Sequence, residues 1–155
     1  MEIIKGDLIK LAQEGKFDII VQGCNCFNTM GGGIARQLRD LYPQVYEADC
    51  KTFAGDASKL GTFTQALCDN FLVLNAYTQY GFNTAGESVD VFEYHAFLKF
   101  LRMLDETQVD SVNYGFPAIG CGLAGGNKQI IYGMIATFAS LVEKRGSTVT
   151  IVEFS

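Results

Sequence analysis

Two glycine-rich segments have the clearest chemical potential in this 155-residue sequence. The first contains three glycines in a row at residues 31–33, and the second contains Gly120, Gly122 and Gly125 in the spacing G-x-G-x-x-G. Glycine lets the backbone adopt a positive φ and approach a ligand closely, so successive N–H groups can surround an anion without lysine or arginine. Two such segments suit a ligand with two linked phosphates. Tight strand-to-helix turns without a ligand are the alternative interpretation.

The second segment also matches the dinucleotide-binding fingerprint of a Rossmann domain. That fingerprint requires a following strand with an acidic residue about 20 positions on, and further strand–helix units after it. Only one strand-like run follows here, and its Glu153 lies too far beyond Gly125. We therefore expect phosphate-loop chemistry without a Rossmann domain, and no NAD-dependent dehydrogenase.

The charge and cysteine content exclude several other classes of function. With 12 basic and 17 acidic residues, the net charge of −5 argues against a nucleic-acid partner, which requires a basic surface. No apolar run approaches the ~20 residues of a membrane span, and no leader pattern is visible, so we expect a cytoplasmic protein without a membrane partner. Five cysteines without framework spacing are expected to be free thiols. Cys24-Asn25-Cys26 has no further ligand pair and His95 is the single histidine, so we expect no metal and no cofactor.

The elements that must position the glycine segments alternate between strand and helix. Asp7 can cap a short helix, and Pro43 can begin another. A helix at 34–41 would bury Ile34, Leu38 and Leu41. The hydrophobic period predicts six strands, at 2–5, 18–22, 62–68, 71–77, 112–116 and 148–154. It also predicts two further helices, at 91–104 and 129–144.

These elements predict a single domain over residues 1–155. The β-branched run at 18–22 is typical of a strand buried on both faces, and strands separated by helices become parallel neighbours. Asp69-Asn70 predicts a hairpin that adds one antiparallel strand. The fold class is therefore α/β, in three α/β/α layers with a mixed, mostly parallel six-stranded sheet. The helix at 91–104 would pack through one stripe of residues: Val91, Tyr94, Leu98, Leu101 and Leu104.

At these segments the sequence resembles the macrodomain family, whose members bind ADP-ribose. Gly6-Asp7-Leu8 is similar to the family's opening G-D-[IL] motif, and residues 18–25 with 31–35 are similar to its D-x-I-V-N-A-A-N…G-G-G-[VI]-A block. Ile119-Gly120-Cys121-Gly122-Leu123 matches its I-G-x-G-L loop. The resemblance covers nearly the whole chain. It is greatest to the subgroup that processes ADP-ribose-1″-phosphate and to the terminal ADP-ribose-glutamate hydrolases.

The resemblance implies a role for each matching residue. Asp7 would accept a hydrogen bond from the adenine amino group, with the Leu8 N–H beside it, or would only cap a helix. Asn25 would bind the distal ribose and is the residue assigned to catalysis, or would only shape a turn. Four aromatic residues lie near predicted strand ends, Tyr77, Tyr80, Phe82 and Phe154, and one of them would stack on adenine or cover the distal ribose. Phe154, on the last strand, is the preferred neighbour of adenine. The expected ligand-binding residues are Asp7, Leu8, Gln22, Asn25, Gly31, Gly32, Gly33, Ile34, Gly120, Cys121, Gly122, Leu123, Ala124, Gly125 and Phe154.

Departures from the family pattern leave catalysis open. The glutamate-directed hydrolases carry Asp where this chain has Ala124, and a lysine in a loop that here reads Thr78-Gln79-Tyr80-Gly81. A covalent lysine mechanism is therefore not expected. Gln22 stands where related phosphatases can carry histidine. Cys121 would have a lowered pKa near a helix N-terminus, or would only fill space.

The sequence thus predicts binding of ADP-ribose or a close derivative. It further predicts hydrolysis, by an ADP-ribose-1″-phosphate phosphatase or an ADP-ribosyl hydrolase, with an ADP-ribosylated protein as a candidate partner. A non-catalytic module that binds ADP-ribose is the alternative. Residues 81–90, rich in small and polar residues, would form a loop over the site.

Overall fold

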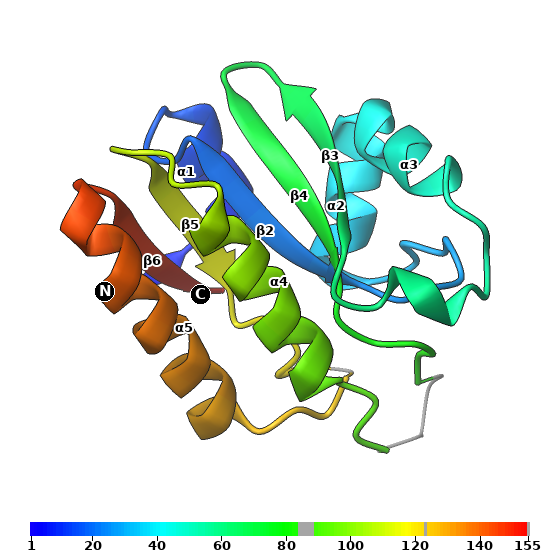
Figure 1. The fold of residues 1–155 in the computed structure, drawn as a ribbon. Helices are drawn as coiled ribbons and strands as arrows, with labels where there is room; N and C mark the ends of the chain where they lie inside the picture. Colours follow the sequence, from blue (N-terminus) through cyan, green and yellow to red (C-terminus); the bar gives the residue numbers. More distant parts are fainter. Residues whose placement is uncertain (84–88, 123, 155) are drawn as a thin grey trace.

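The computed structural model describes residues 1–83, 89–122 and 124–154, and a six-stranded sheet forms its centre (Figure 1). β3 pairs antiparallel with β4 through the predicted hairpin, and the other four pairings are parallel. The mixed, mostly parallel sheet is therefore confirmed. From one edge to the other, the strands are β1 (Glu2–Gly6), β6 (Thr148–Phe154), β5 (Asn113–Pro117), β2 (Ile19–Cys24), β4 (Phe71–Tyr77) and β3 (Phe63–Cys68).

Helices cover both faces of this sheet and complete the three predicted layers. One face carries α4 (Tyr94–Glu106) and α5 (Lys128–Val142), which lie in front in Figure 1. The other carries α1 (Leu8–Gln13), α2 (Gly33–Leu41) and α3 (Pro43–Cys50). Two 3₁₀ turns, η1 (Ala57–Lys59) and η2 (Glu143–Arg145), complete the elements. In the part of the chain that the structure describes, no helix has the length and apolar character needed to cross a bilayer.

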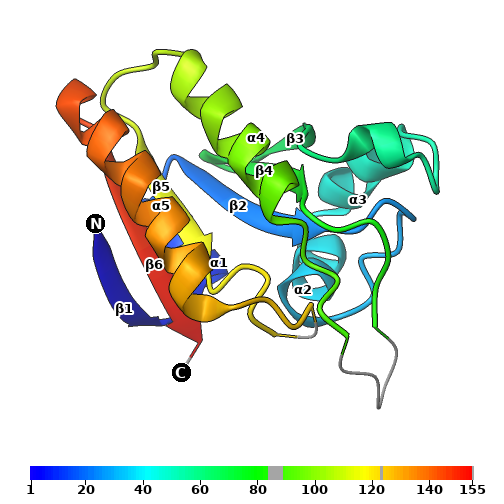
Figure 2. The ribbon, with the colours of Figure 1, turned by 60° about the horizontal axis from the view of Figure 1, so that its bottom comes forward.

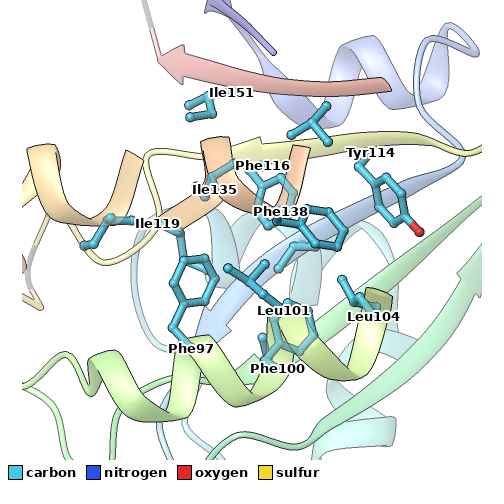
Figure 3. Packing of buried hydrophobic residues seen from close by; sticks show 14 of the residues in the cluster. Phe97, Phe100, Leu101, Leu104, Tyr114, Phe116, Ile119, Ile135, Phe138 and Ile151 are labelled. Atoms are coloured by element: carbon cyan, nitrogen blue, oxygen red, sulfur yellow. The ribbon is translucent and has the colours of Figure 1, made fainter. Parts of the chain in front are cut away.

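The buried face of α4 differs from the predicted stripe. The helix begins at Tyr94 rather than at residue 91, and Leu98 points outward with 36% of its surface exposed. Its contact with the sheet and α5 is made by Phe97 and Phe100 together with the predicted Leu101 and Leu104, as Figure 3 shows. Val91 and Tyr94 are partly buried against the same core, so the predicted stripe was wrong at Leu98 and omitted Phe97 and Phe100.

The face of α2 also differs from its prediction in part. Leu38 is fully buried, but Leu41 is 56% exposed and Ile34 only partly buried. α2 ends beside Tyr42, and α3 begins directly afterwards with Pro43 in its first turn, as predicted. Leu41 therefore lies at the junction between two helices, where a single helical stripe no longer describes burial.

The central strands separate at the end where the glycine segments begin. β2 pairs with β4 along its whole length, but it pairs with β5 only through Ile19 and Ile20, at its amino end. β2 is followed by α2 on one face of the sheet, and β5 is followed by α5 on the opposite face. Adjacent strands whose connections leave toward opposite faces open a crevice at their carboxyl ends, where ligands bind in α/β folds. Figure 2 shows α2 starting at this end.

Candidate functional site

A cavity of about 460 Å³ occupies this crevice, a volume typical of small-molecule sites. Both glycine segments line it. Eight of the fifteen predicted site residues are in its wall: Asn25, Gly31, Gly32, Gly33, Ile34, Gly120, Gly122 and Ala124. Thr29 and Gln79 line it as well. The sheet topology thus brings together two segments that lie almost ninety residues apart in the sequence.

The first glycine segment presents the free amino end of α2 to the cavity. Gly33 starts the helix with a φ of +56°, a conformation that favours glycine, and no side chain caps the helix from Gly32. The N–H groups of the first helical turn have no partner inside the helix. Because α2 is nine residues long, its macrodipole adds partial positive charge at this point. The segment is therefore suited to an anionic ligand.

The second glycine segment uses only some of its N–H groups internally. The backbone N–H groups of Cys121, Gly125 and Gly126 donate to carbonyl groups within the segment. Those of Gly120, Gly122 and Ala124 donate to no backbone carbonyl among the described residues, and these three residues line the cavity. The internal hydrogen bonds fix the loop while the remaining donors stay available to a ligand. Backbone donors in such an arrangement are suited to an anion such as a phosphate.

Gly120 is required for the shape of this segment. Its φ is +73°, and a Cβ at this position would overlap the ring of Phe92. Gly122 has no such restriction, because a Cβ there would meet nothing within 4 Å. The two glycines therefore serve different purposes: one permits the turn, and the other keeps the cavity open.

Asn25 lies in the cavity wall and also shapes the loop. Its Oδ1 accepts a hydrogen bond from the Phe27 N–H at 2.8 Å, and its Nδ2 donates to Thr29 Oγ1 at 2.7 Å. The turn interpretation of this residue is thus confirmed. The proposed contact with a ribose remains compatible with it, because the side chain is only partly buried.

Gln22 lies beneath the cavity rather than in its wall. Its side chain is fully buried on the face of β2 that packs against α2 and α3, where its Nε2 donates to Asn75 Oδ1 at 2.8 Å. Gly23 and Cys24, the next two residues of β2, line the cavity, and Gln22 does not.

Asp7, Leu8 and Phe154 form a separate group at the neighbouring edge of the sheet. Gly6 pairs with Phe154 at the carboxyl ends of β1 and β6, and none of the three predicted residues lines the cavity. Asp7 Oδ1 accepts a hydrogen bond from the Lys10 N–H at 3.1 Å, so its helix-capping role is confirmed. Phe154 is 79% exposed and Leu8 is buried.

Cys121 and Gly125 belong to the second glycine segment without lining the cavity. Burial raises the pKa of the Cys121 thiol, and its Sγ donates to the Ile119 carbonyl at 3.4 Å. The expectation of a lowered pKa is therefore wrong, because desolvation outweighs the effect of nearby Lys128. Gly125 has a φ of +72° and closes the loop onto Gly122. Leu123 and residues 84–88, which are half of the predicted loop at 81–90, lie outside the described residues.

Asp49, on α3, is a cavity-lining residue that the sequence did not indicate. The carboxylate is 1% exposed, and the Tyr77 hydroxyl donates to its Oδ1 at 2.7 Å. Burial raises the pKa of Asp49, while the Tyr77 hydrogen bond and the nearby Lys59 act in the opposite direction. The available signal was its place four residues after Val45, on the buried side of a short helix.

Metal ligands do not gather anywhere in the described parts of the chain, where no three His, Cys, Asp or Glu side chains are grouped. Cys24 and Cys26 are buried free thiols. Burial also raises the pKa of both, so they remain protonated near neutral pH. The chemistry of the cavity therefore depends on backbone donors, amides and one carboxylate.

Solved structures share this fold along almost the whole chain. The macrodomain of Thermus aquaticus DarG matches it with a TM-score of 0.69 and 18% sequence identity, over 98% of this chain and 96% of that one. Thermosipho africanus DarTG in complex with ADP-ribose matches with a TM-score of 0.71 and 19% identity, over 97% of this chain and 40% of its own. By its fold the protein is a macrodomain, which confirms the class that the motifs predicted.

A protein of Enterobacteria phage T4 is similar in sequence and in length. This uncharacterized 17.5 kDa protein in the tk-vs intergenic region is 35% identical over 156 residues, which cover 92% of each chain. The chain belongs to the same family as this phage protein. No protein-family model matches its sequence.

Proposed function

We propose that this macrodomain binds ADP-ribose or a close derivative in the crevice between β2 and β5. The observation that carries the proposal is the pair of glycine loops, which line one cavity and hold backbone N–H groups that donate to no carbonyl among the described residues. A diphosphate offers acceptor oxygens in both directions, and backbone donors hold it without basic side chains. The complex of Thermosipho africanus DarTG with ADP-ribose, which has the same fold, supports this choice of ligand.

The position of the other predicted residues supports the orientation of such a ligand. Asn25 and the amino end of α2 would surround the distal ribose and one phosphate. Asp7 and Phe154 lie at the ends of β1 and β6, where an adenine that extends beyond the cavity would reach them. The carboxylate of Asp7 can accept a hydrogen bond from the exocyclic amino group, since it offers further lone pairs beyond the one that caps α1.

We further propose that the bound derivative is hydrolysed at its distal ribose. A buried carboxylate in the cavity wall favours this activity over a non-catalytic binding module, because a module gains nothing from a desolvated charge. The two candidate reactions are removal of the phosphate from ADP-ribose-1″-phosphate and release of ADP-ribose from a modified protein.

Titration calorimetry with ADP-ribose tests the binding proposal directly. We expect a Kd below about 100 μM, which corresponds to a binding free energy beyond roughly −5.5 kcal/mol. AMP and ribose 5-phosphate, each of which carries half of the ligand, should bind more weakly than ADP-ribose. Absence of heat at millimolar ADP-ribose would refute the proposal.

Turnover assays then separate the hydrolase from the binding module. The substrates are ADP-ribose-1″-phosphate and a peptide that carries ADP-ribose on a glutamate side chain. Release of phosphate or of free ADP-ribose supports hydrolysis, whereas tight binding without turnover of either substrate supports the module.

A further inference from the structure

Asp49 is the only charged side chain among the described residues that line the cavity. The other lining residues are glycines, apolar side chains, amides, a threonine and a protonated thiol. Its Oδ1 accepts the Tyr77 hydroxyl, and Oδ2 receives no hydrogen bond from the described residues. Although Asp49 is 99% buried, its Oδ2 is not among the fully buried side-chain atoms that lack a partner, so it keeps contact with solvent, and Asp49 lines the cavity, where a ligand or an attacking water can reach this oxygen.

A second buried charged residue, Lys59, lies near this carboxylate. Lys59, at the end of η1, is 6% exposed, and its Nζ donates to Asn28 Oδ1 at 2.8 Å and to Thr52 Oγ1 at 2.9 Å. Both acceptors are neutral, and among the described residues Lys59 makes no ion pair within 4.0 Å. The ammonium is nevertheless close enough to lower the pKa of Asp49. Lys59 therefore contributes a positive potential at Asp49, but its ammonium donates its described hydrogen bonds to Asn28 and Thr52 and not to the carboxylate oxygens.

We propose that Asp49 is the catalytic base of this cavity, oriented by the Tyr77 hydroxyl. The proposal rests on the proposed function, because it assigns a residue to hydrolysis of the bound derivative. Tyr77 and Lys59 act through Asp49 and are positioning residues. Asn25, the residue that the family resemblance assigned to catalysis, would then hold the ribose or the attacking water.

The groups around Asp49 act on its affinity for a proton in two directions. Burial raises its pKa and so increases its affinity for a proton, while Tyr77 and Lys59 preserve the ionised form. The titratable groups that face it are Tyr77 from β4, Lys59 from η1, Cys24 from β2, Cys26 from the following loop and Tyr46 from α3. Both thiols have raised pKa values and stay neutral, so Lys59 is the charge that controls Asp49.

A site with one base and no proton donor can catalyse only some of the candidate reactions. Water would attack C1″ of the distal ribose as Asp49 accepts one of its protons. The bond between C1″ and the leaving oxygen breaks, and the leaving group retains the electron pair. The second proton of the water remains on the new 1″-hydroxyl, and Asp49 later returns its proton to solvent. No other described lining residue can donate a proton readily, so the leaving group must be a stable anion such as a carboxylate.

Electrostatics favour an ester over a phosphate as the substrate. Positive charge develops at C1″ when its bond to oxygen breaks, and a nearby carboxylate stabilises that charge. A phosphate dianion at the same place would instead meet a desolvated negative charge. Hydrolysis of an ADP-ribosyl ester of a glutamate or aspartate side chain is therefore expected to exceed hydrolysis of ADP-ribose-1″-phosphate.

The decisive variant is Asp49→Asn, which keeps the size of the side chain and an acceptor for Tyr77. We expect kcat for a glutamate-linked ADP-ribosyl peptide to fall at least about 100-fold, a typical loss for a general base. The Kd for ADP-ribose should change less than about threefold, because binding depends on the glycine loops. Asp40→Asn, an exposed residue of α2, makes the same change of charge and should leave both values unaltered.

The pH profile tests the positioning residues even if Asp49→Asn folds poorly. The Tyr77 hydrogen bond lowers the pKa of Asp49, so Tyr77→Phe should raise that pKa and move the acidic limb of kcat/KM to higher pH. Lys59→Met removes the nearby positive charge and should move the limb in the same direction. Residues that only support the fold would lower activity without shifting the limb.

Each outcome bears on a different proposal. Wild-type turnover by Asp49→Asn, an unmoved acidic limb in both other variants, or faster hydrolysis of ADP-ribose-1″-phosphate than of the ester would overturn the assignment of Asp49. So would a parallel loss of ADP-ribose binding and turnover in Asp49→Asn, which would make it a binding residue. Absence of ADP-ribose binding by the wild-type protein would instead refute the proposed function.

Discussion

Replacement of Gly120 by alanine should destabilise the whole domain as well as the phosphate loop. An alanine at a φ of +73° costs about 1–2 kcal/mol relative to glycine. Its Cβ would also overlap the ring of Phe92, which is 4% exposed and packs against Tyr94 and Phe97. Overpacking of a buried site costs a further ~1–3 kcal/mol. We therefore expect Gly120→Ala to lower the free energy of unfolding by about 2–5 kcal/mol.

Gly122→Ala is the matched control, because the two glycines lie in the same loop and both line the cavity. A Cβ at Gly122 meets no atom within 4 Å and requires no positive φ. Its free energy of unfolding should stay within about 0.5 kcal/mol of the wild-type value. The new methyl group would project toward the ligand, however, so ADP-ribose should bind at least about tenfold more weakly, or roughly 1.4 kcal/mol.

Urea denaturation followed by circular dichroism measures the first effect, and calorimetry with ADP-ribose measures the second. Gly120→Ala should lose mainly stability, and Gly122→Ala should lose only affinity for ADP-ribose. An unfolding free energy for Gly120→Ala equal to that of the wild type would refute the conformational argument. Unchanged affinity in Gly122→Ala would show that this part of the loop does not contact the ligand.

Three further perturbations test the core, the C-terminal strand and the adenine assignment. Phe100→Ala should lower the free energy of unfolding by about 3–5 kcal/mol, and Leu98→Ala should lower it by less than about 1 kcal/mol. Equal losses in the two variants would contradict the observed buried face of α4. The hydrogen bond with Lys128 is the chief cause that lowers the pKa of Glu153. The stabilisation of the folded protein by ionised Glu153 is therefore present above the unfolded pKa of about 4.3, and it is lost as pH falls through the folded pKa. Glu153→Gln should therefore reduce the slope of stability against pH below about pH 5, and an identical slope in acid titrations would exclude this pair. Asp7→Asn keeps a good helix cap and should preserve stability but weaken binding of ADP-ribose and not of ribose 5-phosphate, a contrast that calorimetry with both ligands checks.

Local sequence patterns predicted the elements of the sheet well. The antiparallel hairpin at Asp69-Asn70 and the last strand, Thr148–Phe154, are where the alternation of residues placed them. Both signals are local, because turn residues and a period of two act within a few positions of the chain. Helix faces were predicted less well, since the stripe of α4 was right at Leu101 and Leu104 but included the exposed Leu98 and omitted Phe97 and Phe100.

The same contrast holds for the site. Glycine spacing indicated both loops that line the cavity, because glycine adopts a positive φ readily, as at Gly33 and Gly120. Asp49 left no comparable signal. It is one acidic residue in a short helix, and nothing nearby in the sequence shows that Tyr77 will donate to it or that Lys59 will be buried behind it.

The sequence alone therefore determined the layers, the strand hairpin and the two loops that surround the cavity, because each depends on local conformation or on hydrophobic period. The tertiary structure decided which residues meet. The separation of β2 from β5 opens the crevice, and the register of β4 brings the Tyr77 hydroxyl to Asp49. Those contacts join residues that are far apart in the chain. Which residues meet depends on the fold of the whole domain, and no short segment of the sequence specifies it.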